Sequence, residues 1–195
     1  NPNGGDHTRA SANTQNGFSA NFLNNNRNKR SVALNLKTTE AKEALMRLSA
    51  TADVFIQNFR PGVVDRMGIG EQDVRSVAPN IIYVSISGFG ETGPYAAKPV
   101  YDPLIQALSG LASIQGGSDS ERPRLVRTIL PDKLTGTVTA QAITAALLAR
   151  TRTNEGQHIR ISMLDTILAF LWGSDMGSQT LLENPVSQQD AASFI

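Results

Sequence analysis

Hydrophobic residues follow two alternating patterns along this chain, short apolar runs and longer stretches with helical spacing. The short runs predict strands over residues 31–36, 53–57, 81–86 and 157–162. The helical spacing predicts helices over residues 39–49, 61–67, 71–77, 102–114, 132–150 and 163–176. Residues 1–30 are rich in Asn, Gly, Ser and Thr and predict an extended segment or a long loop. Strands that alternate with helices indicate βαβ units, and therefore an α/β fold with a mostly parallel sheet and flanking helices.

Composition excludes several classes of function. The 195 residues carry 18 Lys and Arg against 17 Asp and Glu, and this balance argues against a dedicated nucleic-acid binder. Because the chain has no cysteine, it has no disulfide and no thiolate nucleophile. His7 and His158 lack metal-ligand spacing, so we expect no metal site. The longest apolar stretch, residues 167–172, is far shorter than the ~20 residues of a membrane span, and we expect a cytoplasmic protein without a membrane partner.

Basic residues are concentrated near the start of the chain. Residues 1–37 contain five Lys and Arg but a single acid, Asp6. A local positive excess of this kind can attract an anionic ligand. A solvated arm, or a segment that contacts a partner chain, would have the same composition, and both alternatives stay open.

Two turns that follow predicted strands could bind a ligand. The turn 58–62 comes directly after one strand, at the sheet edge where open α/β folds bind ligands. Arg60 and Arg66 could contact phosphates there and Phe59 could cover an adenine, although a turn with solvated arginines is the alternative. The glycine-rich loop 88–93 follows the next strand, but its glycine spacing does not fit the dinucleotide-binding fingerprint.

Two carboxylates stand at predicted helix starts. Asp132 opens the long helix, where the ordinary role of an aspartate is an N-cap that accepts backbone hydrogen bonds. The same position would hold the carboxylate ionised and fixed in direction, as a nucleophile requires. Tyr101 and Asp102 open another helix after Lys98 and could frame the same pocket, or be a half-buried tyrosine and a second N-cap.

Several segments, taken in order, resemble the class III CoA-transferases, the CaiB/BaiF group that includes formyl-CoA transferase and α-methylacyl-CoA racemase. The matching stretches are 4–9, 26–31 with 34–37, 52–62, 82–90 with 93–94, Asp132, 147–150, 156–157 and 162–165. The resemblance implies a Rossmann-like large domain, coenzyme A or acyl-CoA as substrate with no permanent cofactor, a carboxylic acid as second substrate, and an interlocked homodimer.

The resemblance also implies roles for individual residues. Asp132 matches the aspartate that attacks the acyl-CoA thioester and forms a mixed anhydride, followed by an enzyme–CoA thioester. The positions that match the CoA site are Leu34, Asn35, Leu36, Lys37, Asn58, Phe59, Arg60, Arg66, Lys98, Val100, Tyr101 and Asp102. The alignment around Pro99 can shift by one residue.

Two other functions remain compatible with the sequence. The racemase branch uses a His and an Asp as paired acid and base, and its His falls where this chain has Tyr101. Because His7 and His158 lie elsewhere in the sequence, CoA transfer is the favoured prediction. A CoA-binding or inactive fragment is the non-enzymatic alternative.

Members of the resembled family are about twice as long as this chain. We therefore expect residues 1–30 to continue a first βα unit, residues 31–178 to form the CoA-binding α/β domain, and residues 179–195 to start a linker to a small domain. On this interpretation, the 195 residues are not expected to be active by themselves.

Overall fold

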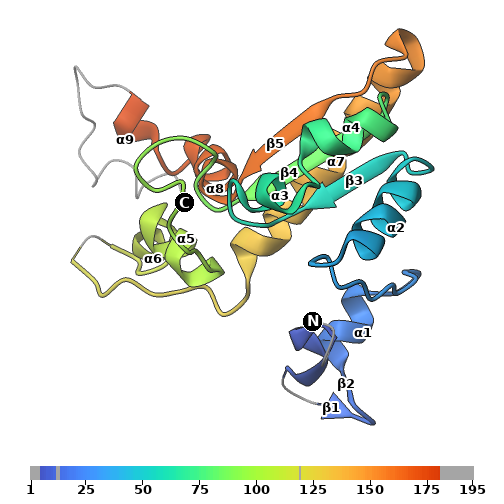
Figure 1. The fold of residues 1–195 in the computed structure, drawn as a ribbon. Coiled ribbons are helices and arrows are strands. Elements are labelled where there is room, and N and C mark those ends of the chain that lie inside the picture. Colours follow the sequence, from blue (N-terminus) through green and yellow to red (C-terminus); the bar gives the residue numbers. More distant parts are fainter. Residues whose placement is uncertain (1–4, 12–13, 119, 181–195) are drawn as a thin grey trace.

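A three-stranded parallel sheet forms the centre of the structure, a computed structural model that describes residues 5–11, 14–118 and 120–180 (Figure 1). The strand order is β3 (Val54–Gln57), β4 (Ile82–Ser87) and β5 (His158–Ser162). Both pairings are parallel, which confirms the prediction of a mostly parallel sheet. Apolar runs in β3 and β4 are typical of parallel strands that are covered on both faces.

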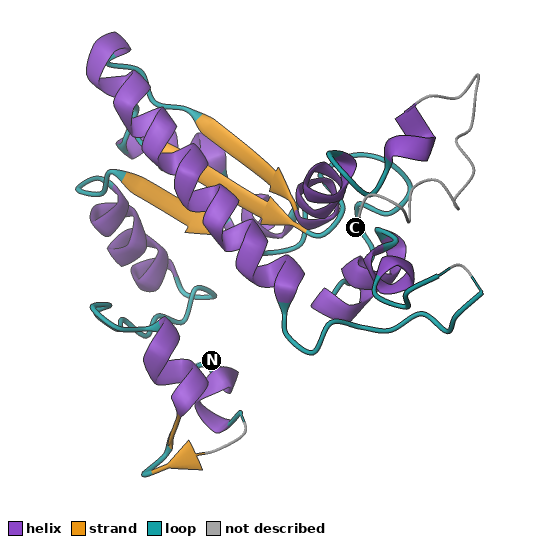
Figure 2. Ribbon diagram, turned by 180° about the vertical axis from the view of Figure 1, so that it is seen from behind, coloured by secondary structure: helices purple, strands orange, loops and turns teal. Residues whose placement is uncertain are grey.

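Helices cover the two faces of this sheet and a third group lies beyond the strand ends (Figures 1 and 2). The long helix α7 (Leu130–Thr153) crosses one face. On the other face lie α2 (Thr39–Ser49), α3 (Val63–Met67) and α4 (Glu71–Val77). The third group comprises α5 (Asp102–Leu108), α6 (Leu111–Ile114), α8 (Met163–Trp172) and α9 (Gly177–Thr180).

Successive residues of β4 point to opposite faces and build two separate apolar clusters. Ile82 and Val84 are fully buried against Ala146 of α7. Tyr83, between them in sequence, is buried with Val74 of α4 on the other face. A third cluster, formed by Ile105, Leu111, Ile167 and Leu171, joins α5, α6 and α8. This third cluster holds the helices that follow the strand ends, and so fixes one wall of the cavity described below.

The N-terminal residues contain more structure than predicted. They form a 3-10 turn (His7–Ala10), the short hairpin β1 (Thr14–Gln15) and β2 (Phe18–Ser19), and α1 (Ala20–Asn25). Buried Ser19 donates a hydrogen bond to the carbonyl of Thr8 and caps α1 at Phe22 N–H, 2.9 Å away. The guanidinium of Arg9 lies 4.1 Å from the ring centroid of Phe22. These contacts come from within the segment, so the prediction of an extended segment or long loop was wrong here.

Three other predicted elements differ in the structure. Residues 31–36 form no strand, because no other described strand lies beside them to complete a ladder of hydrogen bonds. The predicted helix 102–114 is broken at Gly110, whose φ of 84° interrupts the helical path between α5 and α6. Helix α3 begins after Gly62, so Pro61 precedes it. Residues 181–195 of the predicted linker lie outside the described residues.

Other predicted boundaries are confirmed. Thr38 caps α2 by accepting a hydrogen bond from Ala41 N–H at 3.3 Å, and Ser162 caps α8 through Asp165 N–H at 3.2 Å. Within the part of the chain that the structure describes, no helix is both long enough and apolar enough to cross a membrane.

Gly156 provides a test of how tightly the turn before β5 packs. A Cβ at this position would lie 2.5 Å from the carbonyl oxygen of Ile81 and 2.9 Å from that of Pro79. Gly156→Ala should therefore lower the free energy of unfolding by about 1–3 kcal/mol, because backbone atoms must move. Gly136→Ala is the control, since nothing lies within 4 Å of its Cβ position and alanine favours a helix. Urea denaturation of both variants measures the difference, and equal midpoints would contradict the packing at Gly156.

Candidate active site

A cavity of about 570 Å³ opens where the three strands end. Its walls include the turn after β3 (residues 58–61), the end of β4 (residues 86–88) and Met163, the residue that follows β5. The other walls are His7, the segment from Ala96 to Asp102, and Asp132, Thr135 and Gly136 of α7. The carboxyl ends of parallel strands are the usual ligand-binding edge of open α/β sheets, so the fold itself marks this cavity as the candidate site.

Eight of the predicted site residues line this one cavity although they are far apart in sequence. They are Asn58, Phe59, Arg60, Lys98, Val100, Tyr101, Asp102 and Asp132. The other five do not line it: Leu34, Asn35, Leu36 and Lys37 lie in the loop before α2, and Arg66 is exposed on α3. The structure thus brings together the turn after β3, the loop before α5 and the start of α7.

The turn after β3 is held by a side chain of the strand itself. Gln57, which is buried, accepts a hydrogen bond from Phe59 N–H at 2.8 Å and donates one to Ser85 of β4 at 3.0 Å. These bonds fix the direction in which the chain leaves the sheet. As a result, Phe59 and Arg60 reach the cavity while Phe59 stays 45% exposed.

The glycine-rich loop allows a close approach between two walls of the cavity. A Cβ on Gly88 would collide with the Cγ1 atom of Val100. Glycine at this position therefore lets the segment before α5 pack against the end of β4. This close packing is a physical reason for the glycine at position 88.

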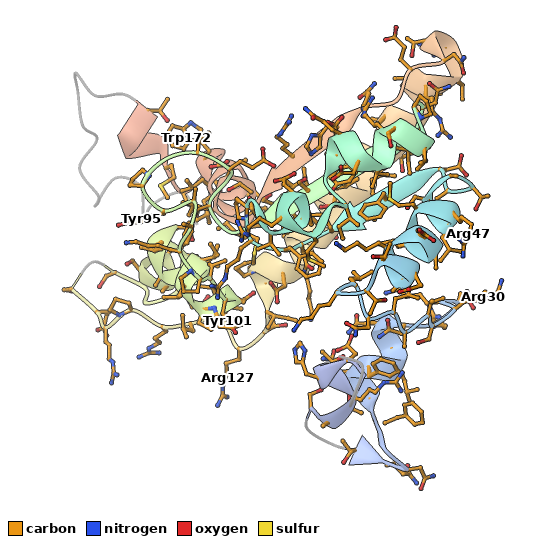
Figure 3. All side chains as sticks on the ribbon, viewed as in Figure 1. Arg30, Arg47, Tyr95, Tyr101, Arg127 and Trp172 are labelled. Atoms are coloured by element: carbon orange, nitrogen blue, oxygen red, sulfur yellow. The ribbon has the colours of Figure 1, made fainter. Side chains whose placement is uncertain are left out.

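One of the positive side chains of the cavity lies beside an aromatic ring. The Lys98 ammonium sits 3.9 Å from the ring centroid of Tyr95, a cation–π contact. Tyr101 is 77% exposed and extends from the start of α5 (Figure 3). Together with Arg60, these groups offer positive charge and flat apolar surface to a ligand that carries both anionic groups and rings.

Asp102 is the buried polar centre of the site. Its side chain is 4% exposed, and one carboxylate oxygen accepts a hydrogen bond from Gln106 Nε2 at 2.6 Å. The other oxygen accepts one from the backbone N–H of Asp132 at 3.1 Å. Asp102 therefore ties the first turn of α7 to α5. It is the first residue of α5, after the N-cap Tyr101, so the alternative of a second N-cap is not what the structure contains.

Asp132 occupies a different position from the one predicted for an N-cap. The N-cap of α7 is Ile129, and Asp132 is the third residue of the helix, with its side chain exposed to the cavity. Partial burial raises the pKa of the Asp132 carboxyl, and the negative charge of Asp102 raises it further. Asp132 is therefore not the N-cap expected from the sequence, and its surroundings raise the pKa of its carboxyl where capping hydrogen bonds would lower it. Its environment favours the protonated form more than water does.

Three residues at or beside the cavity were not among the predicted site residues. Gln106 is fully buried and hydrogen-bonded to Asp102, which lies four residues earlier in α5. Because residues four apart are neighbours on a helix, this spacing is a sequence signal that could have predicted the contact. Thr135, one turn after Asp132, has a buried hydroxyl without a hydrogen-bond partner among the described residues. His7 lines the cavity because of the way the N-terminal segment folds. No local sequence pattern predicts this position.

The residues that the structure describes contain no group of three or more His, Asp or Glu side chains suited to a metal ion. The charged or basic side chains that line the cavity are two carboxylates, a histidine, a lysine and an arginine.

The comparison with known protein families identifies the family of this chain. CoA-transferase family III matches residues 1–193. The chain belongs to this family. The resemblance inferred from the sequence motifs is therefore confirmed, and so is the expected fold class, because the solved structures that share the fold are family members.

Relatives of this family III chain act on several acids. It is 43% identical to the acetyl-CoA:oxalate CoA-transferase of Acetobacter aceti, over 75% of this chain and 38% of that protein. It is 40% identical to the succinate–glutarate CoA-transferase of Agrobacterium fabrum, over 90% and 46% of the two chains. A CaiB/BaiF family protein from Brucella suis superimposes with a TM-score of 0.83 at 34% identity, over 92% of this chain and 49% of that one. The chain thus spans less than half the length of these relatives.

The raised pKa of Asp132 predicts an effect on stability. The pKa of the Asp132 carboxyl is higher in the folded protein than in the unfolded chain. The folded protein therefore loses stability as the pH rises from the lower to the higher of these two pKa values, because the folded state disfavours the ionised carboxylate. Asp132→Asn should therefore raise the thermal midpoint at pH 7, and the gain should shrink toward pH 3. Calorimetry at both values measures this. A lower midpoint at pH 7 would contradict the proposed environment of the carboxylate.

Proposed function

We propose that this chain carries the nucleophile and part of the CoA-binding surface of a CoA-transferase, which moves CoA from an acyl-CoA to a carboxylic acid. The observation that carries the proposal is the Asp132 carboxylate, which faces a cavity lined by Arg60 and Lys98 in a chain of family III. A carboxylate is a weak nucleophile, and a raised pKa increases its basicity and therefore its reactivity once ionised.

Four acyl-transfer steps would complete the reaction. An oxygen of Asp132 attacks the thioester carbonyl, the carbon–sulfur bond breaks, and a mixed anhydride and CoA thiolate form. The thiolate then attacks the aspartyl carbonyl, which releases the first acid and leaves CoA bound to Asp132 as a thioester. The carboxylate of the second acid attacks this thioester, the carbon–sulfur bond breaks, and a new anhydride and CoA thiolate form. Finally, the thiolate attacks the new acyl group and restores the Asp132 carboxylate.

The positive side chains would bind the phosphates of CoA, and the aromatic surface of Phe59 and Tyr101 would bind its ring or its apolar arm. Residues 34–37 and Arg66 remain in the proposed CoA site through the family resemblance, although they do not line the cavity. CoA is then a substrate and not a resident cofactor. The interlocked homodimer and the cytoplasmic location also remain predictions.

A short dicarboxylic acid is the acceptor that we propose. Two relatives are named for oxalate and for succinate with glutarate, and all three are small acids with two carboxylates. One carboxylate would react, and the second would need a positive partner, which Lys98 can supply while Arg60 contacts a phosphate of CoA. Small groups beside Asp132, at Thr135 and Gly136, leave space for the reacting acyl group.

One observation favours acyl-CoA racemisation as a second candidate. His7 lines the same cavity as Asp132, although its place in the sequence gave no indication of this. A histidine and a carboxylate on one cavity could remove and return the proton at the α-carbon of an acyl-CoA. The sequence argument against this chemistry, the lack of a second base near Asp132, therefore loses part of its force.

Asp132→Ala should abolish CoA transfer, because no oxygen remains to form the anhydride. The full-length protein and the variant are incubated in D₂O with acyl-CoAs, oxalate, succinate, glutarate and monocarboxylic acids, and all CoA esters are weighed by mass spectrometry. A new ester that forms with the native protein and not with the variant supports the proposal. Asp165→Ala is the control, since Asp165 is also exposed in the first turn of a helix, α8, but does not line the cavity.

Two results would overturn this assignment. Transfer that survives Asp132→Ala excludes the aspartyl intermediate. Deuterium that appears in an otherwise unchanged acyl-CoA, without any new ester, identifies racemisation instead, and its loss in His7→Ala would assign the second base.

Arg66→Ala and Arg60→Ala test which arginine meets the phosphates of CoA. Loss of a charge-assisted hydrogen bond should weaken CoA binding by about 1.5–3 kcal/mol. We expect this loss for Arg60, which lines the cavity, and for Arg66 if the family resemblance holds at that position. Isothermal titration with CoA measures both. Unchanged affinity in Arg66→Ala would exclude Arg66 from the CoA site. Unchanged affinity in Arg60→Ala would contradict the binding of CoA phosphates by Arg60 in this cavity.

A further inference from the structure

Gln106 is a fully buried amide beneath the candidate active site, and the proposed reaction gives it no role. Only 2% of its surface is exposed. It lies on α5 and contacts neither the cavity nor Asp132 directly. Burial of an amide costs free energy unless its hydrogen bonds are made, so we expect partners for both its oxygen and its nitrogen.

Every polar atom of the Gln106 amide has a partner. Its oxygen accepts a hydrogen bond from Val126 N–H at 2.8 Å. Its nitrogen donates to the Asp102 carboxylate at 2.6 Å and to the carbonyl oxygen of Thr128 at 3.2 Å. The bond from Val126 determines which end of the amide is oxygen, and so requires the nitrogen to face Asp102. The side chain therefore joins α5 to the segment that leads into α7.

The chain of contacts continues from Gln106 to the start of α7. Asp102 uses its second oxygen to accept from Asp132 N–H at 3.1 Å. The N-cap residue, Ile129, has no side-chain oxygen and makes no capping bond. Asp102 thus replaces a missing cap, and Gln106 fixes the orientation of Asp102.

We propose that Gln106 is a positioning residue for Asp132: it fixes the Asp102 carboxylate and the segment 126–128, and through both it sets where the first turn of α7 presents the reacting carboxylate. The kinetic part of this inference rests on the proposed function, whereas the structural part does not. Displacement of a nucleophile by about 1 Å can slow a reaction on the order of 100-fold, so a remote clamp of this kind has a measurable effect.

The charged groups around Asp132 determine the direction of the expected change. Asp102 faces it from α5, Arg60 from the turn after β3, Lys98 from the loop before α5, and His7 from the N-terminal segment. Burial and the Asp102 charge raise the pKa of Asp132. If the clamp opens, Asp102 moves and water enters, and both changes lower the pKa of Asp132 toward its ordinary value.

The test uses Gln106→Met in the full-length protein, since methionine fills the same space but makes none of the three hydrogen bonds. The primary measurement is the pH dependence of carbodiimide labelling at Asp132, read by peptide mass spectrometry, because the reagent attacks the protonated carboxyl. We expect the labelling midpoint to move to lower pH. We also expect kcat to fall about 10- to 100-fold, with little change in KM for acyl-CoA.

Leu111→Ala is the matched control. Leu111 is buried in the apolar cluster that contains Ile105 of α5, so its loss weakens the same region without removing a hydrogen bond to Asp102. Its labelling midpoint should not move. If Gln106→Met does not fold, Gln106→Asn replaces it, because the shorter amide cannot reach both Val126 and Asp102.

The labelling midpoints of the two variants decide whether Gln106 positions Asp132. A midpoint that moves in the Gln106 variant alone supports the positioning role. A midpoint that is unchanged in both variants, or that moves equally in both, overturns it. Labelling does not depend on turnover, so if the native protein transfers no CoA, the proposed function fails while the labelling still decides the role of Gln106.

Discussion

The hydrogen bond from Asp132 N–H to the Asp102 carboxylate connects everything else at the site. A helix leaves the N–H groups of its first turn without partners, and α7 begins at a residue that cannot cap it. The partner comes instead from α5, a helix of the group beyond the strand ends. This contact, together with the packing of Leu130 and Leu134 against the Ile105 cluster, joins α7 to the helix that follows the loop of Lys98 and Tyr101. The cavity exists because these two parts meet there.

The same contact places one carboxylate beside another. Burial raises the pKa of Asp132, and the negative charge of Asp102 beside it raises this pKa further. Asp102 does not share this exposure: it is buried and hydrogen-bonded on both oxygens, whereas Asp132 faces the cavity. The pair is therefore unequal, with one carboxylate held by two hydrogen bonds and the other facing the cavity. If Asp132 is the nucleophile, as proposed, the protein gives up stability at the residue where reactivity is needed.

How far the sequence predicted this structure depends on where the deciding contacts lie. Strands β3 to β5 and helices α2, α4 and α7 follow local patterns, and all were predicted. Residues 31–36 look like a strand, but a strand also needs a neighbour, which a local pattern does not contain. Site residues at strand ends and helix starts were found for the same local reasons. Gln106 and His7 were missed because their places at the site arise from contacts between distant segments.

The cavity divides into two chemically different walls, and this division constrains how a substrate can sit in it. One wall is the start of helix α7, which contributes the carboxylate of Asp132 and the small residues Thr135 and Gly136. The positive and aromatic groups come from turns and loops, at residues 58–61 and 96–102. A CoA ester would therefore place its acyl carbon against the helix and its charged part along the loops. Loops tolerate sequence change better than helices do. On the proposed mechanism, binding specificity can therefore vary in the loops while the Asp132 carboxylate keeps its place on the helix.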